Sequence, residues 1–510
     1  MKIINITVFL AVSVFSLVIF ADSMTKYLGH DEQMYCTAAV FLAQGKMIYR
    51  DFSYVAQMPY HPLLCAAVFK ILNTTYYLLT VRILSVLCDV LTVICIFGIY
   101  RNAFRVFPVT GLLLGLAGIL LYLFNPFVDY TNGFAWNHGF VIFAVVLSFR
   151  LLQTTDFTKK SKYWRIAVIS ALLTLATCTR ITTVFLQLLF FIFLVTWPAE
   201  SARQRFKNIL PFLITAAVIL IWPLWVIISS PRAFYLNLFA IPVLNSSWVH
   251  KTGMSCGRFN ITTDFLTTRS SYLVILIAIY LFAVFLFNPP LLAFARKQGG
   301  RIAMLAVLLA VTFFVIAFIP LTIWPQYFAA PLLFLIISFA YPLLYLRQLA
   351  KDRIFSIAAV LIAACVAITI VAYPAAFGRL HVLFKPQRWI PIQVHNTSVN
   401  IADKTKYPKL VLTLAPLYAL EGGCDIYTEF AAGPFVYRVA DILSPAERKV
   451  THTAGSETLG ELVRNNPPSA LIVGVEHQSL DISLFEAVSP EPQSWGKEAY
   501  DTGPILYFKY

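Results

Sequence analysis

Residues 354–373 read IFSIAAVLIAACVAITIVAY, a run of 20 residues without a charged side chain. About 20 consecutive apolar residues are what an α-helix needs to cross the hydrocarbon core of a bilayer. Basic residues precede the run, with Arg347, Lys351 and Arg353 on its amino-terminal side. The stretch therefore predicts a membrane-spanning helix, and comparable runs recur along the chain before it. Together they predict a polytopic α-helical membrane protein.

The bulk composition excludes an ordinary soluble protein. Of the 510 residues, 59% are hydrophobic and 12% are charged, and the mean hydropathy is +0.76. Soluble chains are about 45–50% apolar and about 25% charged. The net charge of +15 falls mostly in short loops between apolar runs, which is the distribution that sets membrane topology. We therefore expect contacts with lipid headgroups and no binding of nucleic acid.

Eleven apolar segments are predicted to span the membrane. They cover residues 3–21, 78–100, 107–124, 138–153, 166–179, 181–198, 208–228, 272–288, 302–320, 326–346 and 354–373. No small-residue cleavage site follows the first segment, which favours an uncleaved helix over a signal peptide. The basic loops share one side only if residues 166–198 form a hairpin of two short helices with Arg180 at its tip. This parity predicts a cytoplasmic N-terminus and a C-terminus on the far side.

The composition changes after Tyr373, and no membrane-spanning run follows. Residues 1–373 are therefore predicted to form a membrane domain, and residues 374–510 a soluble α/β domain on the far side. Three segments of the second domain are strand-like, and a capped helix is expected to begin near Ser456. The strand-like segments are 409–414, 470–475 and 505–510. Cys256 and Cys424 both fall in far-side segments, which permits a disulfide between them.

The long first far-side loop, residues 22–77, contains the most informative polar sequence. A short helix on the membrane surface is predicted to begin at Asp31-Glu32 and to end at Gly45, because glycine suits the position after a helix C-terminus. Carboxylates at a helix N-terminus often serve only to stabilise the helix, so this pattern alone leaves a structural role open. A second surface helix is expected at residues 62–72.

This loop resembles that of the GT-C glycosyltransferases, in particular the bacterial relatives of the protein O-mannosyltransferases and of the lipid A aminoarabinose transferase. The residues that carry the resemblance are Asp31-Glu32, Gly45, Tyr49-Arg50-Asp51-Phe52, Pro59 to Pro62, Arg82, Arg180, Pro325-Gln326-Tyr327, Pro331 and Gly433-Pro434-Phe435. The resemblance implies transfer of a sugar from a polyprenyl-phosphate donor to an acceptor hydroxyl. The acceptor is expected to be a lipid, a glycan or a protein on the extracytoplasmic side.

The resemblance also implies roles for single residues. Asp31 is expected to be the general base, and Glu32 to orient the site or to help bind a divalent cation, the only cofactor expected. The expected donor-phosphate ligands are Arg180, Arg82, His61 and Tyr327. The expected contacts to the acceptor or a metal are Asp129, His138 and Asp51. His61 stands where the aminoarabinose transferase pattern has lysine, so it would bind phosphate only when protonated or as a neutral donor.

Other interpretations remain open at this point. Arg82 could extend from a helix end toward the headgroups, Tyr327 could be an interfacial aromatic residue, and His138 could cap a helix. A transporter or flippase of lipid-linked sugars would place ionisable residues at mid-membrane, and an envelope-assembly scaffold would need no Asp31-Glu32 pair. The expected location is a bacterial inner membrane, with the C-terminal domain in the periplasm.

Overall fold

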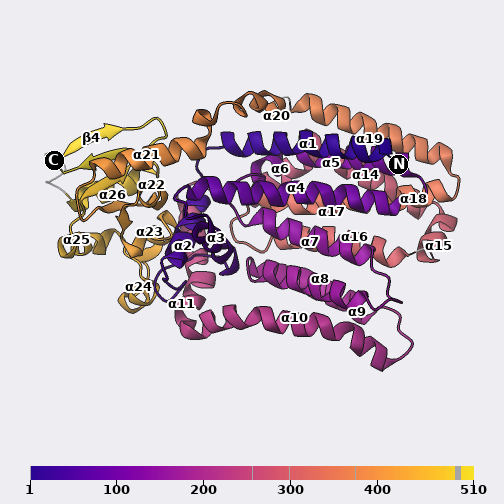
Figure 1. Ribbon diagram of the computed structural model, residues 1–510, viewed down its shortest axis with the longest axis horizontal. Coiled ribbons are helices and arrows are strands. Elements are labelled where there is room, and N and C mark those ends of the chain that lie inside the picture. The colour runs from indigo at the N-terminus through magenta and orange to yellow at the C-terminus, as the bar shows by residue number, and fades with distance from the viewer. Residues whose placement is uncertain (1, 255–256, 298, 374, 489–494, 510) are drawn as a thin grey trace.

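The computed structural model describes residues 2–254, 257–297, 299–373, 375–488 and 495–509. Figure 1 shows a long bundle of helices with the strands and helices of the C-terminal residues packed against one end. The N-terminus lies at the opposite end of the bundle. Cys256, whose position in the sequence permits a disulfide with Cys424, and residue 374, the predicted domain boundary, lie outside the described residues.

A helix covers each of the eleven segments predicted to span the membrane. These helices are α1 (Lys2–Thr25), α4 (Tyr77–Ala103), α5 (Pro108–Leu123), α7 (His138–Gln153), α8 (Lys162–Thr177), α9 (Val184–Val195), α10 (Ala202–Ser229), α14 (Arg269–Leu286), α16 (Gly300–Ala317), α17 (Ala329–Ser338) with α18 (Ala340–Gln348), and α19 (Asp352–Ala372). Among the described residues, six helical segments are long and apolar enough to cross a membrane, or seven with the bent pair of α13 (Arg258–Thr267) and α14. The protein is thus a multi-pass membrane protein, although helix length alone supports fewer spans than the eleven predicted.

The predicted hairpin of two short helices is formed by α8 and α9. At about 1.5 Å per residue, the 16 residues of α8 and the 12 of α9 give lengths of about 24 Å and 18 Å. Both are shorter than the hydrocarbon core of about 30 Å. Figure 1 shows α8 ending short of α10 on the side of the C-terminal domain. The hairpin tip with Arg180 therefore lies within the depth that the longer helices span.

Helix α10 shows how the sequence distinguishes lipid-facing from core-facing residues. Its exposed apolar side chains include Ile214, Val218, Ile221, Trp225 and Ile228. These positions recur every three or four residues, so they share one face of the helix. A large apolar stripe on a long helix is stable when the surrounding solvent is lipid. Helices α17 and α18, by contrast, are mostly buried inside the bundle.

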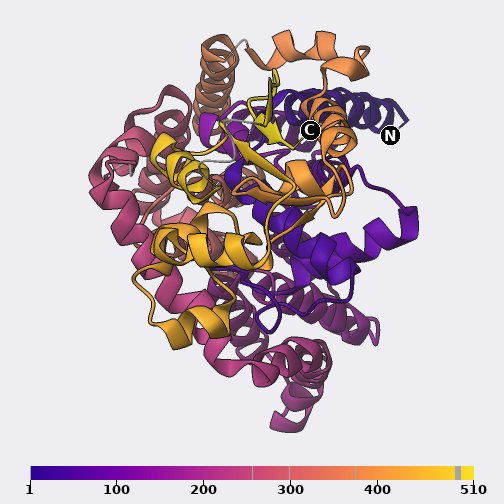
Figure 2. The ribbon, with the colours of Figure 1, turned by 90° about the vertical axis from the view of Figure 1, so that its left-hand side faces the viewer.

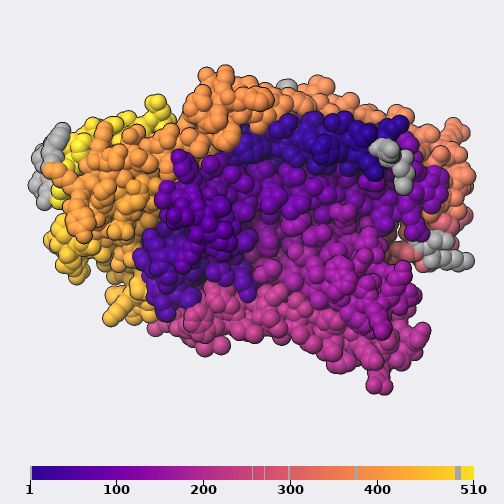
Figure 3. Space-filling view, viewed as in Figure 1, coloured from indigo at the N-terminus to yellow at the C-terminus, as the bar shows by residue number. Residues whose placement is uncertain are grey.

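The two predicted surface helices of the first loop are present as α2 (His30–Ala43) and α3 (Tyr60–Leu72), which pack against each other. Gly45 follows α2 with a φ of +90°, the left-handed conformation that favours glycine. The prediction that α2 lies on the membrane surface needs a correction, because residues 32–41 are all buried. The helix lies between the bundle and the C-terminal domain, whose Leu417 and Val436 belong to the same apolar cluster as Phe41. Figure 3 shows the indigo first loop pressed against the orange C-terminal residues.

The C-terminal domain is built on a five-stranded sheet with the order β2-β1-β3-β5-β4. Its strands are β1 (Leu410–Thr413), β2 (Asp425–Ile426), β3 (Ala470–Val473), β4 (Gly496–Ala499) and β5 (Ile505–Phe508). β2, β1 and β3 are parallel, and β5 is antiparallel to both of its neighbours. The three predicted strands coincide with β1, β3 and β5. Strands β2 and β4 were not predicted, because neither contains an apolar run. Both lie at an edge of the sheet, and they are short or carry charged residues.

Helices pack around this sheet and connect it to the bundle. They are α21 (Ile390–Lys404), α22 (Pro416–Leu420), α23 (Pro434–Ala440), α24 (Pro445–Thr451), α25 (Ser456–Asn465), which begins at the predicted Ser456, and α26 (Gln478–Val488). The remaining helices are α6 (Pro126–Thr131), α11 (Pro231–Tyr235), α12 (Ile241–Lys251), α15 (Pro289–Lys297) and α20 (Ala375–Gly378). Figure 2 looks onto the C-terminal domain, with its orange and yellow elements in front of the helix ends. The domain thus covers the end of the bundle from which α2 begins.

Candidate active site

Asp31 lies in the first turn of α2, where the bundle meets the C-terminal domain. Burial raises the pKa of its carboxyl group to about 6, although the positive charges of His30, Arg180 and Arg438 act in the opposite direction. Within the described part of the chain, no hydrogen bond to this carboxylate is formed. A carboxylate with a raised pKa and free oxygen atoms can take a proton near neutral pH.

Glu32, the next residue, forms a buried ion pair with Arg82 of α4. Arg82 Nε donates to Glu32 Oε1 at 2.9 Å and Arg82 Nη2 donates to Glu32 Oε2 at 2.8 Å. Both side chains are fully buried. The carboxylate also accepts hydrogen bonds from the backbone N–H groups of Gly29 at 2.8 Å and Ala135 at 2.6 Å. Glu32 therefore joins the start of α2 to α4 and to the segment before α7.

The remaining N–H groups of Arg82 donate to backbone carbonyl groups at the end of α1. Nη1 reaches Ser23 O at 2.7 Å and Lys26 O at 2.8 Å, and Nη2 reaches Tyr27 O at 2.9 Å. With the two bonds to Glu32, the five donors of the guanidinium group are all used. The sequence predicts a phosphate contact for Arg82, whereas the structure commits its donors to the protein. No pattern in the sequence around Arg82 predicts these hydrogen bonds.

Arg180, His138 and Tyr327 come together on the bundle side of the site. Arg180 Nη1 donates to His138 Nε2 at 2.7 Å, and the guanidinium carbon lies 4.6 Å from the centre of the Tyr327 ring. The rings of His138 and Tyr327 are parallel within 15° at 6.1 Å. The backbone N–H groups of Met58 and Tyr60 hold the hairpin tip through the carbonyl groups of residues 179 and 178. Three residues that are far apart in the sequence thus form one basic and aromatic cluster.

His61 lies beside this cluster and is buried. Burial lowers its pKa to about 4, so the imidazole is neutral at physiological pH. Its ring packs edge-on against Tyr35 of α2 at 5.5 Å, and its Nδ1 atom has no hydrogen-bond partner among the described residues. A neutral ring offers a hydrogen bond but no positive charge. The sequence allows His61 to bind phosphate either as a protonated imidazole or as a neutral hydrogen-bond donor. Only the neutral donor fits this environment.

The other two predicted acidic residues have partners of their own. Asp129 Oδ1 accepts a hydrogen bond from Arg379 at 2.8 Å, and Asp129 Oδ2 accepts one from the Tyr373 hydroxyl. Arg379 follows α19, so Asp129 ties α6 to the connection into the C-terminal domain. Asp51 pairs with Arg50 at 2.7 Å and accepts a hydrogen bond from Met47 N at 2.7 Å. The structure therefore places both carboxylates in ion pairs with arginine, whereas the sequence predicts contacts to acceptor or metal.

The described residues contain no group of three His, Cys, Asp or Glu side chains arranged to hold a metal ion. Glu32, a predicted cation ligand, already receives four hydrogen bonds. The use of a divalent cation stays a prediction.

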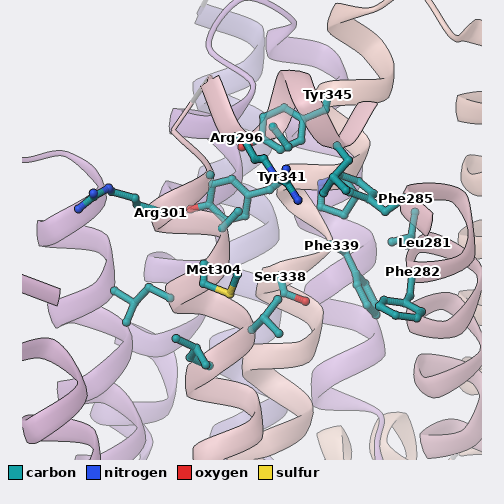
Figure 4. Close-up of a pocket in the computed structure, with 18 of the residues that line it drawn as sticks. Leu281, Phe282, Phe285, Arg296, Arg301, Met304, Ser338, Phe339, Tyr341 and Tyr345 are labelled. Atoms are coloured by element: carbon teal, nitrogen blue, oxygen red, sulfur yellow. The ribbon is translucent and has the colours of Figure 1, made fainter. Parts of the chain in front are cut away.

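Two pockets lie in the bundle, and α9, α16 and α17 contribute to the lining of both. The smaller one is lined by His138, Arg180 and Tyr327 and continues between α9 and α16, at Leu186 and Phe313. The larger one, with a volume of about 930 Å³, is lined mainly by apolar residues of α9, α14, α16, α17 and α18. Figure 4 shows its aromatic lining, which includes Phe285, Phe339, Tyr341 and Tyr345. The larger pocket contains none of the predicted site residues.

Sequence reasoning missed two charged residues of the C-terminal domain. Arg438 on α23 and Glu476 after β3 face the start of α2, where Glu476 Oε1 lies 2.8 Å from His30 Nδ1. Neither residue belongs to a motif or a charge cluster in the sequence. Only the docking of the domain brings them to the site.

Comparison with known proteins identifies the architecture. Residues 56–228 match the family model described as dolichyl-phosphate-mannose-protein mannosyltransferase. ArnT from Cupriavidus metallidurans bound to undecaprenyl phosphate is similar with a TM-score of 0.60 and 13% identity, over 98% of this chain and 97% of that chain. Its apo structure gives a TM-score of 0.61 at 13% identity, over 99% of this chain and 98% of that chain.

The chain has the fold of these ArnT structures. A more distant likeness is to the oligosaccharyltransferase of Archaeoglobus fulgidus in its apo form, with a TM-score of 0.51 and 10% identity over 98% of this chain and 74% of that chain. A comparison with curated proteins gives no significant match. The resemblance to the GT-C glycosyltransferases that the first loop suggested is therefore confirmed, by a family model over residues 56–228 and by the fold.

The Glu32–Arg82 pair generates a prediction about stability. Truncating one partner of a buried ion pair leaves the other charge uncompensated and costs about 3–5 kcal/mol. Both Arg82→Met and Glu32→Gln should therefore lower the unfolding temperature of the purified protein in detergent. Arg464→Gln on the exposed face of α25 is the control, since surface substitutions stay within about 0.5 kcal/mol. Equal unfolding temperatures for Arg82→Met and the control would contradict a structural role of the pair.

Proposed function

We propose that this GT-C protein transfers a sugar from a polyprenyl-phosphate donor to an acceptor hydroxyl on the side of the membrane where the C-terminal domain lies. The observation that supports this most directly is the half-buried Asp31 carboxylate in the first turn of α2, on which the charge of Arg180 acts. A base and a cation are the two groups that such a transfer needs, because one proton leaves the acceptor and one phosphate leaves the sugar.

Asp31 acts in this proposal as the general base. It accepts the proton of the acceptor hydroxyl while that oxygen forms a bond to the anomeric carbon of the sugar. The bond between the anomeric carbon and the phosphate oxygen breaks, and the electron pair goes to the lipid phosphate. A raised pKa near 6 keeps Asp31 ionised at neutral pH while making it more basic than an exposed carboxylate.

Arg180 and Tyr327 are proposed to bind the phosphate of the donor. The guanidinium group of Arg180 donates one hydrogen bond to His138 and lies over the face of the Tyr327 ring. Arginine binds phosphate through two parallel N–H donors, and such charge-assisted bonds are about twice as strong as neutral ones. Placed at the leaving group, this charge stabilises the transition state more than the ground state.

The lipid part of the donor is proposed to follow the two neighbouring pockets. Along α9 the lining continues from Leu186 to Leu189, and along α16 from Phe313 to Leu308, so the smaller pocket leads toward the larger one. The larger pocket is apolar over most of its wall, as a polyprenyl chain requires. The solved ArnT structure bound to undecaprenyl phosphate has the same fold, which supports a donor of this class.

We further propose that the protein lies in a bacterial inner membrane, with the C-terminal domain in the periplasm. The basic end of α15 and the basic segment between α18 and α19 lie at the end of the bundle opposite to that domain. Positive loops stay on the cytoplasmic side. The donor and the acceptor would then meet on the periplasmic side.

Asp31→Asn is expected to abolish transfer without affecting the fold. Loss of a general base lowers the rate by about 10²–10⁴-fold. We would measure sugar release from radiolabelled undecaprenyl-phosphate sugars by the purified protein in liposomes, supplied with lipid A, peptide and glycan acceptors. Glu461→Gln, an exposed carboxylate on α25, is the matched control. Equal activity of Asp31→Asn and the control would remove Asp31 from the mechanism, and no release by the wild type from any donor would favour a transporter.

The pH dependence of the reaction follows from the same carboxylate. A general base works only when it is ionised, so the activity should fall as the pH drops through the pKa of Asp31, which is about 6. We expect the acid side of the kcat/KM profile to have its midpoint near pH 6 in the same liposome assay. A midpoint near pH 4, the value of an exposed carboxylate, would show that the base lies in a polar environment and is a different residue.

Arg180→Gln should weaken binding of the donor phosphate and slow its departure. We expect kcat/KM for the donor to fall at least about tenfold, because a charge-assisted hydrogen bond contributes about 1.5–3 kcal/mol. Binding of undecaprenyl phosphate alone can be measured by how much this ligand raises the unfolding temperature of the protein. This measurement separates the affinity for the phosphate from the rate of the reaction. Arg203→Gln, exposed at the start of α10, provides the comparison. Unchanged binding and unchanged kinetics in Arg180→Gln would exclude the phosphate contact.

A further inference from the structure

The C-terminal domain presents two buried charges to the first turn of α2. Glu476 Oε1 lies 2.8 Å from Nδ1 of His30, the residue before Asp31. Glu476 Oε2 lies 3.6 Å from Nη2 of Arg438. The side chains of Glu476 and Arg438 are 2% and 9% exposed, whereas His30 is half-exposed. The three residues join the domain to the helix that carries the proposed base.

Arg438 and Glu476 are held in place by their surroundings but are not fully hydrogen bonded. The guanidinium group of Arg438 lies 4.8 Å from the ring centre of Trp248 on α12 and 5.8 Å from that of Phe435. Among the described residues, Arg438 Nε and Glu476 Oε2 have no hydrogen-bond partner. The loop that carries Glu476 is held by Asp481, which accepts a hydrogen bond from Gly474 N at 2.8 Å.

Such an arrangement is costly for a purely structural contact. Buried charges with unused donors and acceptors are often less stabilising than apolar residues of the same size. An apolar contact would dock the domain equally well, and α22, which carries Leu417, already packs against α2. The domain therefore does not require these charges in order to dock on the bundle.

The charges act on Asp31 from two directions. Glu476 raises the pKa of His30, mainly through their hydrogen bond, and so favours the imidazolium form beside Asp31. Arg438 and His30 both favour the ionised form of the Asp31 carboxyl group. The titratable and charged groups that face Asp31 are His30, Glu32 and Tyr35 of α2, Tyr54 after it, Arg180, Tyr327 and Arg438. Those that face His30 are Asp31, Glu476 and Arg438.

We propose that Glu476 and Arg438 are positioning residues of the transfer site, which hold the first turn of α2 and keep Asp31 ionised and available as the base. Glu476 acts through His30, and Arg438 acts through its own charge. This inference rests on the proposed function. Its consequence is that the base is competent only while the C-terminal domain is docked on α2.

The test uses the full-length protein in liposomes, with Glu476→Gln and Arg438→Gln. Both substitutions keep the approximate shape of the side chain and remove its charge. We expect the acid side of the kcat/KM profile to move up by about one pH unit, so that activity falls about fivefold at pH 6 and recovers at pH 8. Glu461→Gln and Arg464→Gln on the exposed face of α25 should leave the profile unchanged.

A second set of variants keeps the proposal falsifiable if a charge substitution impairs folding. His30→Asn removes the imidazole through which Glu476 acts, and it should shift the profile in the same direction. The double variant with Glu476→Gln should shift it no further than His30→Asn alone, since coupled residues are not additive. Independent, additive shifts would contradict the route through His30.

Two other results would overturn the proposal. An equal loss of activity at every pH, with an unshifted acid side, would mean that the two residues only dock the domain. An unchanged profile in both variants would mean that they have no effect on the base. Failure of the proposed function is recognised separately, since Asp31→Asn would then be as active as the wild type.

Discussion

The ion pair between Glu32 and Arg82 is the interaction on which the rest of the site depends. Five N–H donors and two carboxylate oxygens, all buried, join the end of α1, the start of α2, α4 and the segment before α7. Asp31 is the neighbour of Glu32, so its position follows from this network. Burying a charge is costly unless the charge is paired and hydrogen bonded, and the many backbone groups that converge on this one arginine reduce that cost.

Burial by the C-terminal domain is the second constraint. Helix α2 contributes residues 32–41 to a core shared with the domain, so the acidic start of the helix faces the junction rather than bulk water. The same burial that raises the pKa of Asp31 lowers that of His61. One physical effect, the loss of water around an ionisable group, thus produces a more basic carboxylate and a neutral imidazole in one site.

Hydropathy and helix-end signals predicted much of the fold. The apolar segments, the strands β1, β3 and β5, the start of α25 and the glycine after α2 all depend on residues within one element, and such local patterns can be read from the chain. The number of membrane spans was less predictable, because short helices such as α8 and α9 are apolar without being long. The site was predicted only in part. Arg180 at the hairpin tip does lie with His138 and Tyr327. Arg82, Asp129 and Asp51, in contrast, form hydrogen bonds and ion pairs with other protein groups instead of facing a substrate.

The sequence by itself determined which segments lie in lipid, because the free energy of transferring a side chain from water to lipid depends mainly on the side chain itself. It also determined that the acidic pair follows the first helix. The tertiary structure alone decided which charges meet. Glu32 and Arg82 are 50 residues apart, and His30 and Glu476 are 446 residues apart. The pKa of an ionisable group depends on the water it loses and the charges it gains, and both are properties of the packed chain.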